Sequence, residues 1–352
     1  MIDGQQWCLR GMVKTCRLQT AWYSGRNPAK EEQSDTIVVE FRRDGAWERR
    51  WQRDPRGSQW IKIYEYDDSG RLVATRADGP DRWTESRVYN YDSAGRIDRV
   101  TARDASGRER VAETYAYDAD GRKTRTRYVE SEACADTYWG VEGTDACYSA
   151  PAVVSITTLY DDDDRPVTTL FRNAKDEIVT RVDLHYDHVG NLVEEAGVRA
   201  SEQALAPELA GLPGVDGVPM RRFFKYDGHG RRIEIVIPFG DLGMYRKTIT
   251  YNEEGDPSVE VSYDQGREHE SDEEGRVSSV TDRDTVPESE SRFRYQYDLH
   301  GNWVEKIAES RGGPVQDFAI SVIERRTIMY FDYALRSDCD DRLREHPSCS
   351  LH

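Results

Sequence analysis

The sequence predicts an all-β protein, a repeat array of about ten two-stranded β-hairpin units forming a curved, spiralling antiparallel sheet or partial shell. Three observations predict it. The pattern Tyr-x-Tyr-Asp-x-x-Gly-Arg recurs at spacings of 25 or 26 residues. Aromatic and polar residues alternate before each copy, which is the side-chain period of a strand. Sustained helical periodicity is absent, so strands and turns account for the repeat.

Three copies of the pattern are complete, at Tyr64–Arg71, Tyr89–Arg96 and Tyr115–Arg122. Later copies keep its core. The residues expected to build the repeat are Tyr64, Tyr66, Asp67, Gly70, Arg71, Tyr89, Tyr91, Asp92, Gly95, Arg96, Tyr115, Tyr117, Asp118, Gly121, Arg122, Tyr186, Asp187, Gly190, Tyr226, Asp227, Gly230, Tyr295, Tyr297, Asp298 and Gly301. Weaker copies begin at Phe41, Tyr160, Tyr251 and Ser271.

Each part of the pattern has a mechanical reason. The Asp accepts hydrogen bonds from turn amides, and the Gly three residues later takes a positive φ without steric cost. Asp-x-x-Gly therefore predicts a type I turn that closes with a left-handed residue. The Arg that follows is expected to pair with the turn Asp or to lie on a Tyr ring of the next unit.

A second turn is expected to divide each unit, at Asp78-Gly79, at Asp104–Gly107 and at Asp264–Gly266. Each unit then reads strand, turn, strand, turn, with about 5 to 8 residues per strand. Tyr64 and Tyr66 fall on one face of their strand, and stacked units would align such aromatics into ladders.

The array is expected over residues 37–332, after an N-terminal cap segment (1–36) and before a C-terminal tail (333–352). Two wide spacings mark insertions at 129–151 and 197–220. The second contains Ser201–Leu209, which could form one short helix capped by Ser201. Insertions in arrays often cluster on a functional face, although the pattern favours a tolerated surface loop for either one taken alone.

Composition excludes several classes of function. The net charge of −17 disfavours nucleic acid as a partner. No apolar stretch approaches 18 residues, which predicts no transmembrane helix. The start, Met1–Gln5, lacks the basic and apolar regions of a signal peptide, so the chain as written is expected in the cytoplasm.

The six cysteines point to another compartment. They fall in three local pairs, Cys8 with Cys16, Cys134 with Cys147 and Cys339 with Cys349. Two pairs lie at the chain ends and one lies in an insertion, where disulfides would restrain fraying segments. This reading predicts three disulfides and an oxidising compartment. Six ordinary thiols are the alternative, because spacing alone does not fix connectivity.

The run Tyr64, Tyr66, Asp67, Gly70, Arg71 and Leu72 resembles the YD repeat of the RHS family, and the resemblance covers about residues 37–332. That family includes bacterial RHS polymorphic toxins, cocoon-forming toxin-complex components and teneurins. The resemblance implies a spiralling β-sheet that winds into a hollow shell. Those shells use far more repeats, and the family's Asp-Pro-x-Gly-Leu ending is missing here. Only the repeat architecture is carried over, without toxin activity or self-cleavage.

No catalytic or cofactor motif stands out. The sequence lacks Gly-x-Ser-x-Gly, a Walker loop, His-Glu-x-x-His and a glycine-rich dinucleotide motif. His188, His229 and His300 read as turn residues. Asp161–Asp164 resembles a calcium loop less than a degenerate turn, because calcium loops need spaced ligands. No catalytic residue, cofactor or metal is therefore expected.

The expected function is a non-catalytic YD/RHS-repeat scaffold for binding or encapsulation at the bacterial cell envelope or exterior, with a protein or carbohydrate ligand. The alternative is a cytoplasmic immunity or accessory partner of an RHS-type polymorphic toxin system. An enzyme hidden in the insertions is the third hypothesis.

Overall fold

The computed structural model describes residues 9–23, 31–79, 85–128, 153–199, 220–238, 243–271, 277–282 and 287–331. The regular elements described there are 21 strands. They are β1 (Val13–Tyr23), β2 (Glu31–Phe41), β3 (Trp47–Arg53), β4 (Gln59–Tyr66), β5 (Leu72–Asp78), β6 (Glu85–Tyr91), β7 (Ile97–Asp104), β8 (Glu109–Tyr117), β9 (Lys123–Tyr128), β10 (Ser155–Tyr160), β11 (Pro166–Arg172), β12 (Ile178–Tyr186), β13 (Leu192–Arg199), β14 (Met220–Tyr226), β15 (Arg232–Pro238), β16 (Gly243–Tyr251), β17 (Pro257–Ser271), β18 (Val277–Asp282), β19 (Ser289–Tyr297), β20 (Trp303–Gly312) and β21 (Ala319–Tyr330). The described residues include no helix long and apolar enough to span a membrane.

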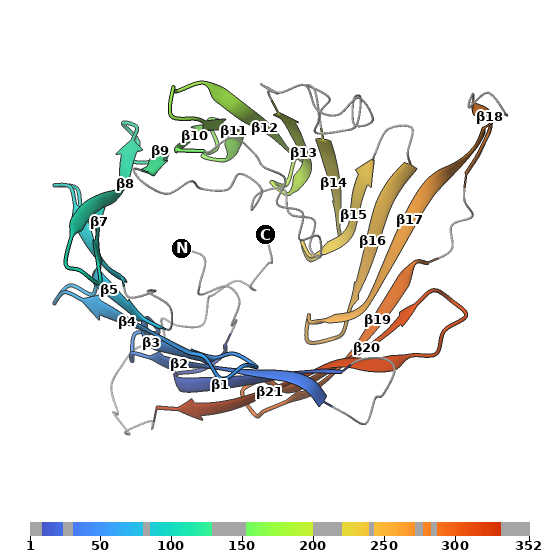
Figure 1. Ribbon diagram of the computed structural model, residues 1–352, viewed down its shortest axis with the longest axis horizontal. Coiled ribbons are helices and arrows are strands. Elements are labelled where there is room, and N and C mark those ends of the chain that lie inside the picture. Colours follow the sequence, from blue (N-terminus) through green and yellow to red (C-terminus); the bar gives the residue numbers. More distant parts are fainter. Residues whose placement is uncertain are drawn as a thin grey trace.

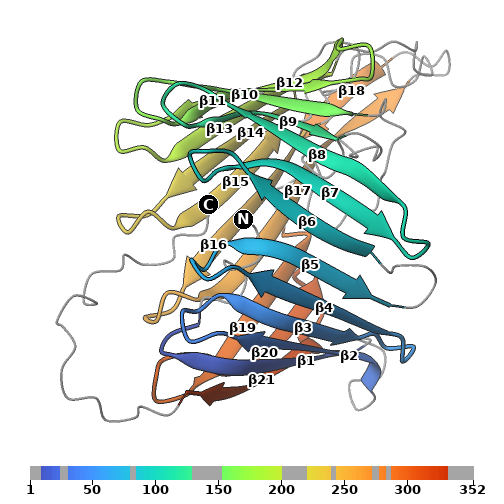
Figure 2. The same cartoon turned by 90° about the vertical axis from the view of Figure 1, so that its left-hand side faces the viewer.

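All strands except β18 form one ring in chain order, each antiparallel to its neighbours (Figures 1 and 2). The ring closes because β21 pairs with β1, from Val13 opposite Tyr330 to Trp22 opposite Val322. The hairpin repeat is thus confirmed, but the expected open sheet or partial shell is a closed 20-stranded barrel. Strand twist and the bulges beside the turns of the repeat bend the sheet, and pairing its two edges satisfies their backbone groups.

The seam between β21 and β1 has the geometry of a hairpin unit, except that no continuous turn connects its two strands. In the complete unit, Tyr66 pairs with Leu72 and the amide of Asp67 donates to the carbonyl of Arg71. At the seam, Tyr330 pairs with Val13 and the amide of Phe331 donates to the carbonyl of Met12. Gly11, at φ +85°, stands where Gly70 stands at φ +83°. We call residues 328–331 with 11–15 the split unit. It joins nine continuous hairpins whose turns begin at Arg42, Asp67, Asp92, Asp118, Asp161, Asp187, Asp227, Asn252 and Asp298.

Part of the predicted cap segment, 1–36, therefore lies in the sheet, because β1 and the start of β2 fall within it. β1 pairs with β2 over Thr15–Tyr23 as well as with β21. The ring needs this strand, since without it β2 and β21 would both be edges.

The predicted turn at Asp264–Gly266 is wrong. β17 runs straight through these residues, which pair with Gly243–Tyr245 of β16. The ladder with β16 offers these three residues backbone partners that a turn would give up. Beyond Gly266, β17 pairs with β18 in a hairpin that projects from the ring (Figure 1). The weak copy at Ser271 thus closes a hairpin outside the ring, with Ser271 opposite Val277.

The strands on either side of each predicted insertion pair directly, and residues 197–199 and Met220 of the second belong to β13 and β14. Arg127 lies opposite Ser155 across the first, and Gly197 lies opposite Met220 across the second. The ring is therefore continuous at both places. The helix predicted over Ser201–Leu209 lies outside the described residues, as do Cys134 and Cys147.

Buried apolar residues gather in two small clusters on this single-layered sheet. One contains Val153, Phe171, Val179, Val182 and Leu184. The other lies at the seam and contains Val13, Cys16, Val39 and Phe41. With so little core, contacts between neighbouring units must carry much of the stability, as in other repeat proteins.

Candidate functional site: the repeat turns and the pocket beside the seam

The turn that begins at Asp67 shows the chemistry of the repeat. The amide of Gly70 donates to the Asp67 carbonyl at 2.9 Å, which closes the type I turn. Oδ1 of Asp67 accepts from the amides of Ser69, at 3.0 Å, and Arg71, at 2.9 Å. Gly70 has φ +83°, as the pattern predicts.

The other predicted turn residues occupy equivalent positions. Positive φ is found at Gly95, Gly121, Gly190, Gly230 and Gly301, and Asp92, Asp118, Asp187, Asp227 and Asp298 each accept turn amides. These residues form a row of separate turns and do not converge on one centre.

The turn interpretation of Asp161–Asp164 is confirmed. Asp164 takes the glycine position at φ +63°, and the Asp161 amide donates to the Arg165 carbonyl at 2.9 Å. His229 and His300 sit in turns as predicted, each donating its backbone amide to the turn Asp at 2.9 Å. The described residues contain no group of three or more His, Cys, Asp or Glu side chains that could hold a metal ion.

The turn arginine fulfils both of its proposed roles at once. Nε of Arg71 donates to Oδ2 of Asp67 at 2.8 Å, and the same guanidinium lies 4.8 Å from the ring centroid of Tyr91 in the next unit. Arg96, Arg122, Arg165 and Arg231 repeat this arrangement over Tyr117, Tyr160, Tyr186 and Tyr251. One side chain thus fixes its own turn and covers the neighbouring unit.

The hydroxyl of that covered tyrosine makes a second link between units, which the sequence reasoning missed. Tyr91 Oη donates to the carbonyl of Leu72 at 2.6 Å. Equivalent bonds to the preceding unit come from Tyr66, Tyr117, Tyr160, Tyr186, Tyr226 and Tyr251. The use of Tyr rather than Phe at this position was the available signal, because only the hydroxyl distinguishes them. We call the Arg–Tyr contact and this hydrogen bond together the latch.

The latch modifies the expected aromatic ladder. Some rings do meet, as Trp47 and Tyr64 do with centroids 5.7 Å apart. The second Tyr of most units meets a guanidinium instead. Cations alternating with rings make each contact partly electrostatic.

The turns also perturb proton affinities. Hydrogen bonds from Ser69 and from the Arg71 amide hold the pKa of Asp67 well below its usual range. The Arg96 amide similarly lowers the pKa of Asp92, and the Arg122 side chain that of Asp118. Burial raises the pKa of Tyr91 and Tyr117. These carboxylates are thus kept ionised, and they serve as acceptors within their turns.

A network of charged side chains spans β6 to β8. Arg87 contacts Glu85 at 2.5 Å and Glu113 at 2.8 Å, and Arg110 contacts Glu85 at 3.3 Å. Tyr115 donates its hydroxyl to Glu113, and its pKa is raised, first by burial and then by that bond. Each charge here faces an opposite one, so the arrangement joins strands and offers no activated base or nucleophile.

The last two continuous units modify the latch. In the unit that starts at Asn252, Asp256 replaces the arginine, and Tyr297 donates to its carboxylate at 2.7 Å. In the next, Asn302 replaces it. The Asn302 side chain accepts from the amide of Arg10 at 2.5 Å and donates to its carbonyl at 2.8 Å. Asn302 is 3% exposed, so this buried amide ties the last turn to the segment that leads into β1.

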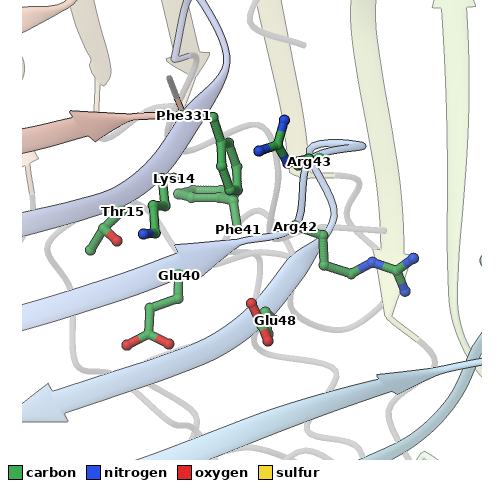
Figure 3. Close-up of a pocket in the computed structure, with 8 residues that line it drawn as sticks. All are labelled: Lys14, Thr15, Glu40, Phe41, Arg42, Arg43, Glu48 and Phe331. Carbon is green, nitrogen blue, oxygen red and sulfur yellow. The ribbon is translucent and has the colours of Figure 1, made fainter. Parts of the chain in front are cut away.

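A pocket of about 440 Å³ lies beside the seam (Figure 3). Its walls come from the start of β1, the end of β2, the following turn and the residue after β21. The lining residues are Lys14, Thr15, Glu40, Phe41, Arg42, Arg43, Glu48 and Phe331. Of the predicted repeat positions only Phe41, where a weaker copy begins, lines this pocket.

The cysteine predictions remain open. Cys16 is a buried, free thiol, and burial raises its pKa to about 11. Its proposed partner Cys8 lies outside the described residues, as do Cys339 and Cys349. The three disulfides therefore stay predictions, to be decided by peptide mapping without reduction.

No protein-family model and no curated protein matches this chain. Among solved structures, the chain is similar to the toxin-complex protein in the crystal structure of TcdB2-TccC3, with 12% identity and TM-score 0.37 over 86% of this chain and 19% of that one. The chain is also similar to one in the TcdB2-TccC3-Cdc42 crystal structure, with 12% identity and a TM-score of 0.37. This match covers 80% of this chain and 16% of that one. A porin-like protein from Bacteroides uniformis matches with 8% identity and a TM-score of 0.33. This match covers 91% of this chain and 98% of that one. This chain thus spans less than a fifth of the toxin-complex chains. These TM-scores are too low to assign function.

Proposed function

We propose that this chain is a non-catalytic RHS/YD-repeat scaffold that binds or encloses a protein or carbohydrate ligand. The observation that carries the proposal is the latch. The ionisable side chains that recur in the sequence close their own turns, and the turn arginines also cover a tyrosine of the next unit. Because these side chains already bond to one another, they support a structural role for the repeat.

Specificity for one partner then has to come from parts of the chain that differ from the repeated units. A uniform ladder offers the same groups at every step, whereas the insertions at 129–151 and 197–220 each occur once. The strands that flank each insertion pair directly, so the ring does not depend on the residues between them. We therefore propose that the insertions carry the partner-binding surface.

The proposed location is the bacterial cell envelope or exterior, supported by the paired spacing of the cysteines. The second candidate is a cytoplasmic immunity or accessory partner of an RHS-type toxin system, in which the six cysteines would be ordinary thiols. Fractionation of native cells with an antibody to the chain separates the two. Recovery in the envelope or medium supports the first, and recovery only in cytosol supports the second.

The test of the scaffold is excision of residues 200–219, bridged by a short Gly-Ser linker. Because Gly197 and Met220 pair directly, the two flanking strands keep their register. The shortened ring should fold with unchanged circular dichroism and recover less partner from the native source. The matched control inserts the same linker into the turn at 54–58, where it should not alter recovery. Equal recovery from both variants would remove this insertion from the binding surface. Turnover of a recovered ligand into product would favour an enzyme.

A further inference from the structure

We propose that the pocket beside the seam binds a small organic carboxylate with an apolar body, such as an aryl-alkyl acid. This inference does not depend on the scaffold function. It rests on the split unit, on two aromatic rings and on two cationic side chains that have no carboxylate partner among the described residues.

The pocket exists where the split unit lacks the latch. In a complete unit, the Asp–Arg pair holds the turn and the guanidinium covers the next tyrosine. In the split unit, Phe331 stands at the Asp position and Met12 stands at the Arg position. The next ring is that of Phe41, which has no hydroxyl. Met12 is 39% exposed, and its thioether carries no charge that could cover the next ring as the turn arginines do.

Two phenylalanines give the pocket an apolar wall. Phe41 and Phe331 both line the pocket (Figure 3). Phe41 is 8% exposed and belongs to the seam cluster, which fixes its position. Apolar walls with a few placed polar groups, enclosing several hundred Å³, are typical of small-molecule sites.

Lys14 reaches the pocket because of a bulge. Val13 pairs with Tyr330 and Thr15 pairs with Met329, so Lys14 is the extra residue on β1. Bulges redirect side chains and are common beside functional sites. The described residues offer its ammonium group no ion pair, and Lys14 is one of the residues that line the pocket (Figure 3).

Arg43 supplies the second cation. Its guanidinium lies 5.2 Å from the centroid of the Phe331 ring and has no ion-pair partner in the described part of the chain. The neighbouring Arg42 differs, because it pairs with Asp44 at 3.1 Å and covers Tyr66. Arg43 can therefore present its planar fork to a ligand carboxylate.

The charge balance selects an anion. The lining contains two acidic residues, and one of them, Glu40, lies 3.7 Å from Arg49 outside the pocket. The charge of Glu48 therefore offsets only one of the two positive charges of Lys14 and Arg43. A local excess of positive charge is unusual in a chain of net charge −17. A ligand with an apolar body can lie on the Phe rings while its carboxylate pairs with these cations.

The test is calorimetric titration of the full chain with phenylacetate, with its neutral isostere phenylacetamide and with phenethylamine. Phenylacetate should bind at least about tenfold more tightly than the amide, and the amine should not bind, because the two cations contribute charge-assisted bonds. Lys14→Gln and Arg43→Gln should each weaken phenylacetate about tenfold. Both variants should fold, because neither side chain forms an ion pair with another described residue.

Arg99→Gln is the matched control, since Arg99 is also exposed and outside any ion pair of the described residues, on β7. It should leave binding unchanged. Equal affinity for the acid and the amide would overturn the proposal, as would equal weakening by Arg99→Gln or no binding of phenylacetate. Thermal unfolding of each variant verifies that the comparison is made between folded proteins.

Discussion

The backbone amide of Phe331 donates a hydrogen bond to the carbonyl oxygen of Met12 at 2.9 Å, although the two residues lie at opposite ends of the described chain. The bond from Asp67 to Arg71 has the same length and the same place in its hairpin. The ring is thus closed by the interaction that builds each unit. Closure removes both sheet edges, which would otherwise be open to pairing with other chains.

Gly11 should matter more to stability than an equivalent glycine in an open turn. Gly11 and Gly45 have φ +85° and +83°, so an added side chain is strained at both. A Cβ at Gly11 would also meet the Tyr330 ring at 3.2 Å, whereas nothing lies within 4 Å at Gly45. Gly45→Ala should cost about 1 kcal/mol, and Gly11→Ala about 1 kcal/mol more.

Urea denaturation of the two variants measures both costs. Because the two positions share backbone geometry, their difference reports the packing at the seam. Equal costs for Gly11→Ala and Gly45→Ala would mean that the segment before β1 is not held against Tyr330.

The hydrogen bond of the latch can be tested by a substitution that removes only the tyrosine hydroxyl. Tyr91→Phe removes the bond to the Leu72 carbonyl and leaves that acceptor without its partner, so it should cost about 1 kcal/mol. Tyr89→Phe is the control two residues earlier on β6, where the hydroxyl makes no hydrogen bond within the described structure, and it should cost close to nothing. Differential scanning calorimetry of both variants gives the comparison. A larger loss from Tyr89→Phe would contradict the latch.

The turn carboxylates should make the protein sensitive to acid. The pKa values of Asp67, Asp92, Asp118, Asp161 and Asp227 are all lowered in the folded protein. Such groups add stability above their unfolded pKa of about 4, and that stability is lost as pH falls through the lower folded pKa. Thermal stability should therefore be flat near neutrality and fall steadily below about pH 4.

Asp227→Asn tests this assignment, because an Asn oxygen still accepts the turn amides, as Asn252 does from Asp256 at 2.8 Å. The variant should lose stability less steeply below pH 4 than the parent protein. Asp98→Asn, an exposed carboxylate outside the tight turn, is the control. Identical pH profiles for the parent and Asp227→Asn would show that the turn carboxylates do not set the acid limit.

Cys16 should react slowly in the folded, reduced protein. Its thiol is buried and its pKa is raised to about 11, so little thiolate exists at pH 8. Iodoacetamide labelling followed by mass spectrometry should modify Cys16 only after denaturant is added. Rapid labelling in native buffer would show that the seam cluster opens. A Cys8–Cys16 disulfide in unreduced native material would instead confirm the paired-cysteine prediction.

Turns could be predicted from the sequence where a few neighbouring residues decide the backbone conformation. Asp67, Gly70 and Arg71 predict their turn because an amide acceptor, a positive φ and a return strand are all met within five residues. The same logic identified Asp164 as a substitute for glycine. It was wrong at Asp264–Gly266, where a long ladder with β16 supplies the backbone hydrogen bonds that a turn would have left unmade.

The sequence by itself determined the unit, its period and the residues that form each turn, because those depend on side chains close together in the chain. Only the tertiary structure decided that the array closes, since the small bend of each hairpin must accumulate around the ring before β21 can meet β1. It also decided the pocket, because Lys14, Arg43 and Phe331 become neighbours only when the split unit forms. No local pattern marks that meeting, since its two halves lie more than 300 residues apart.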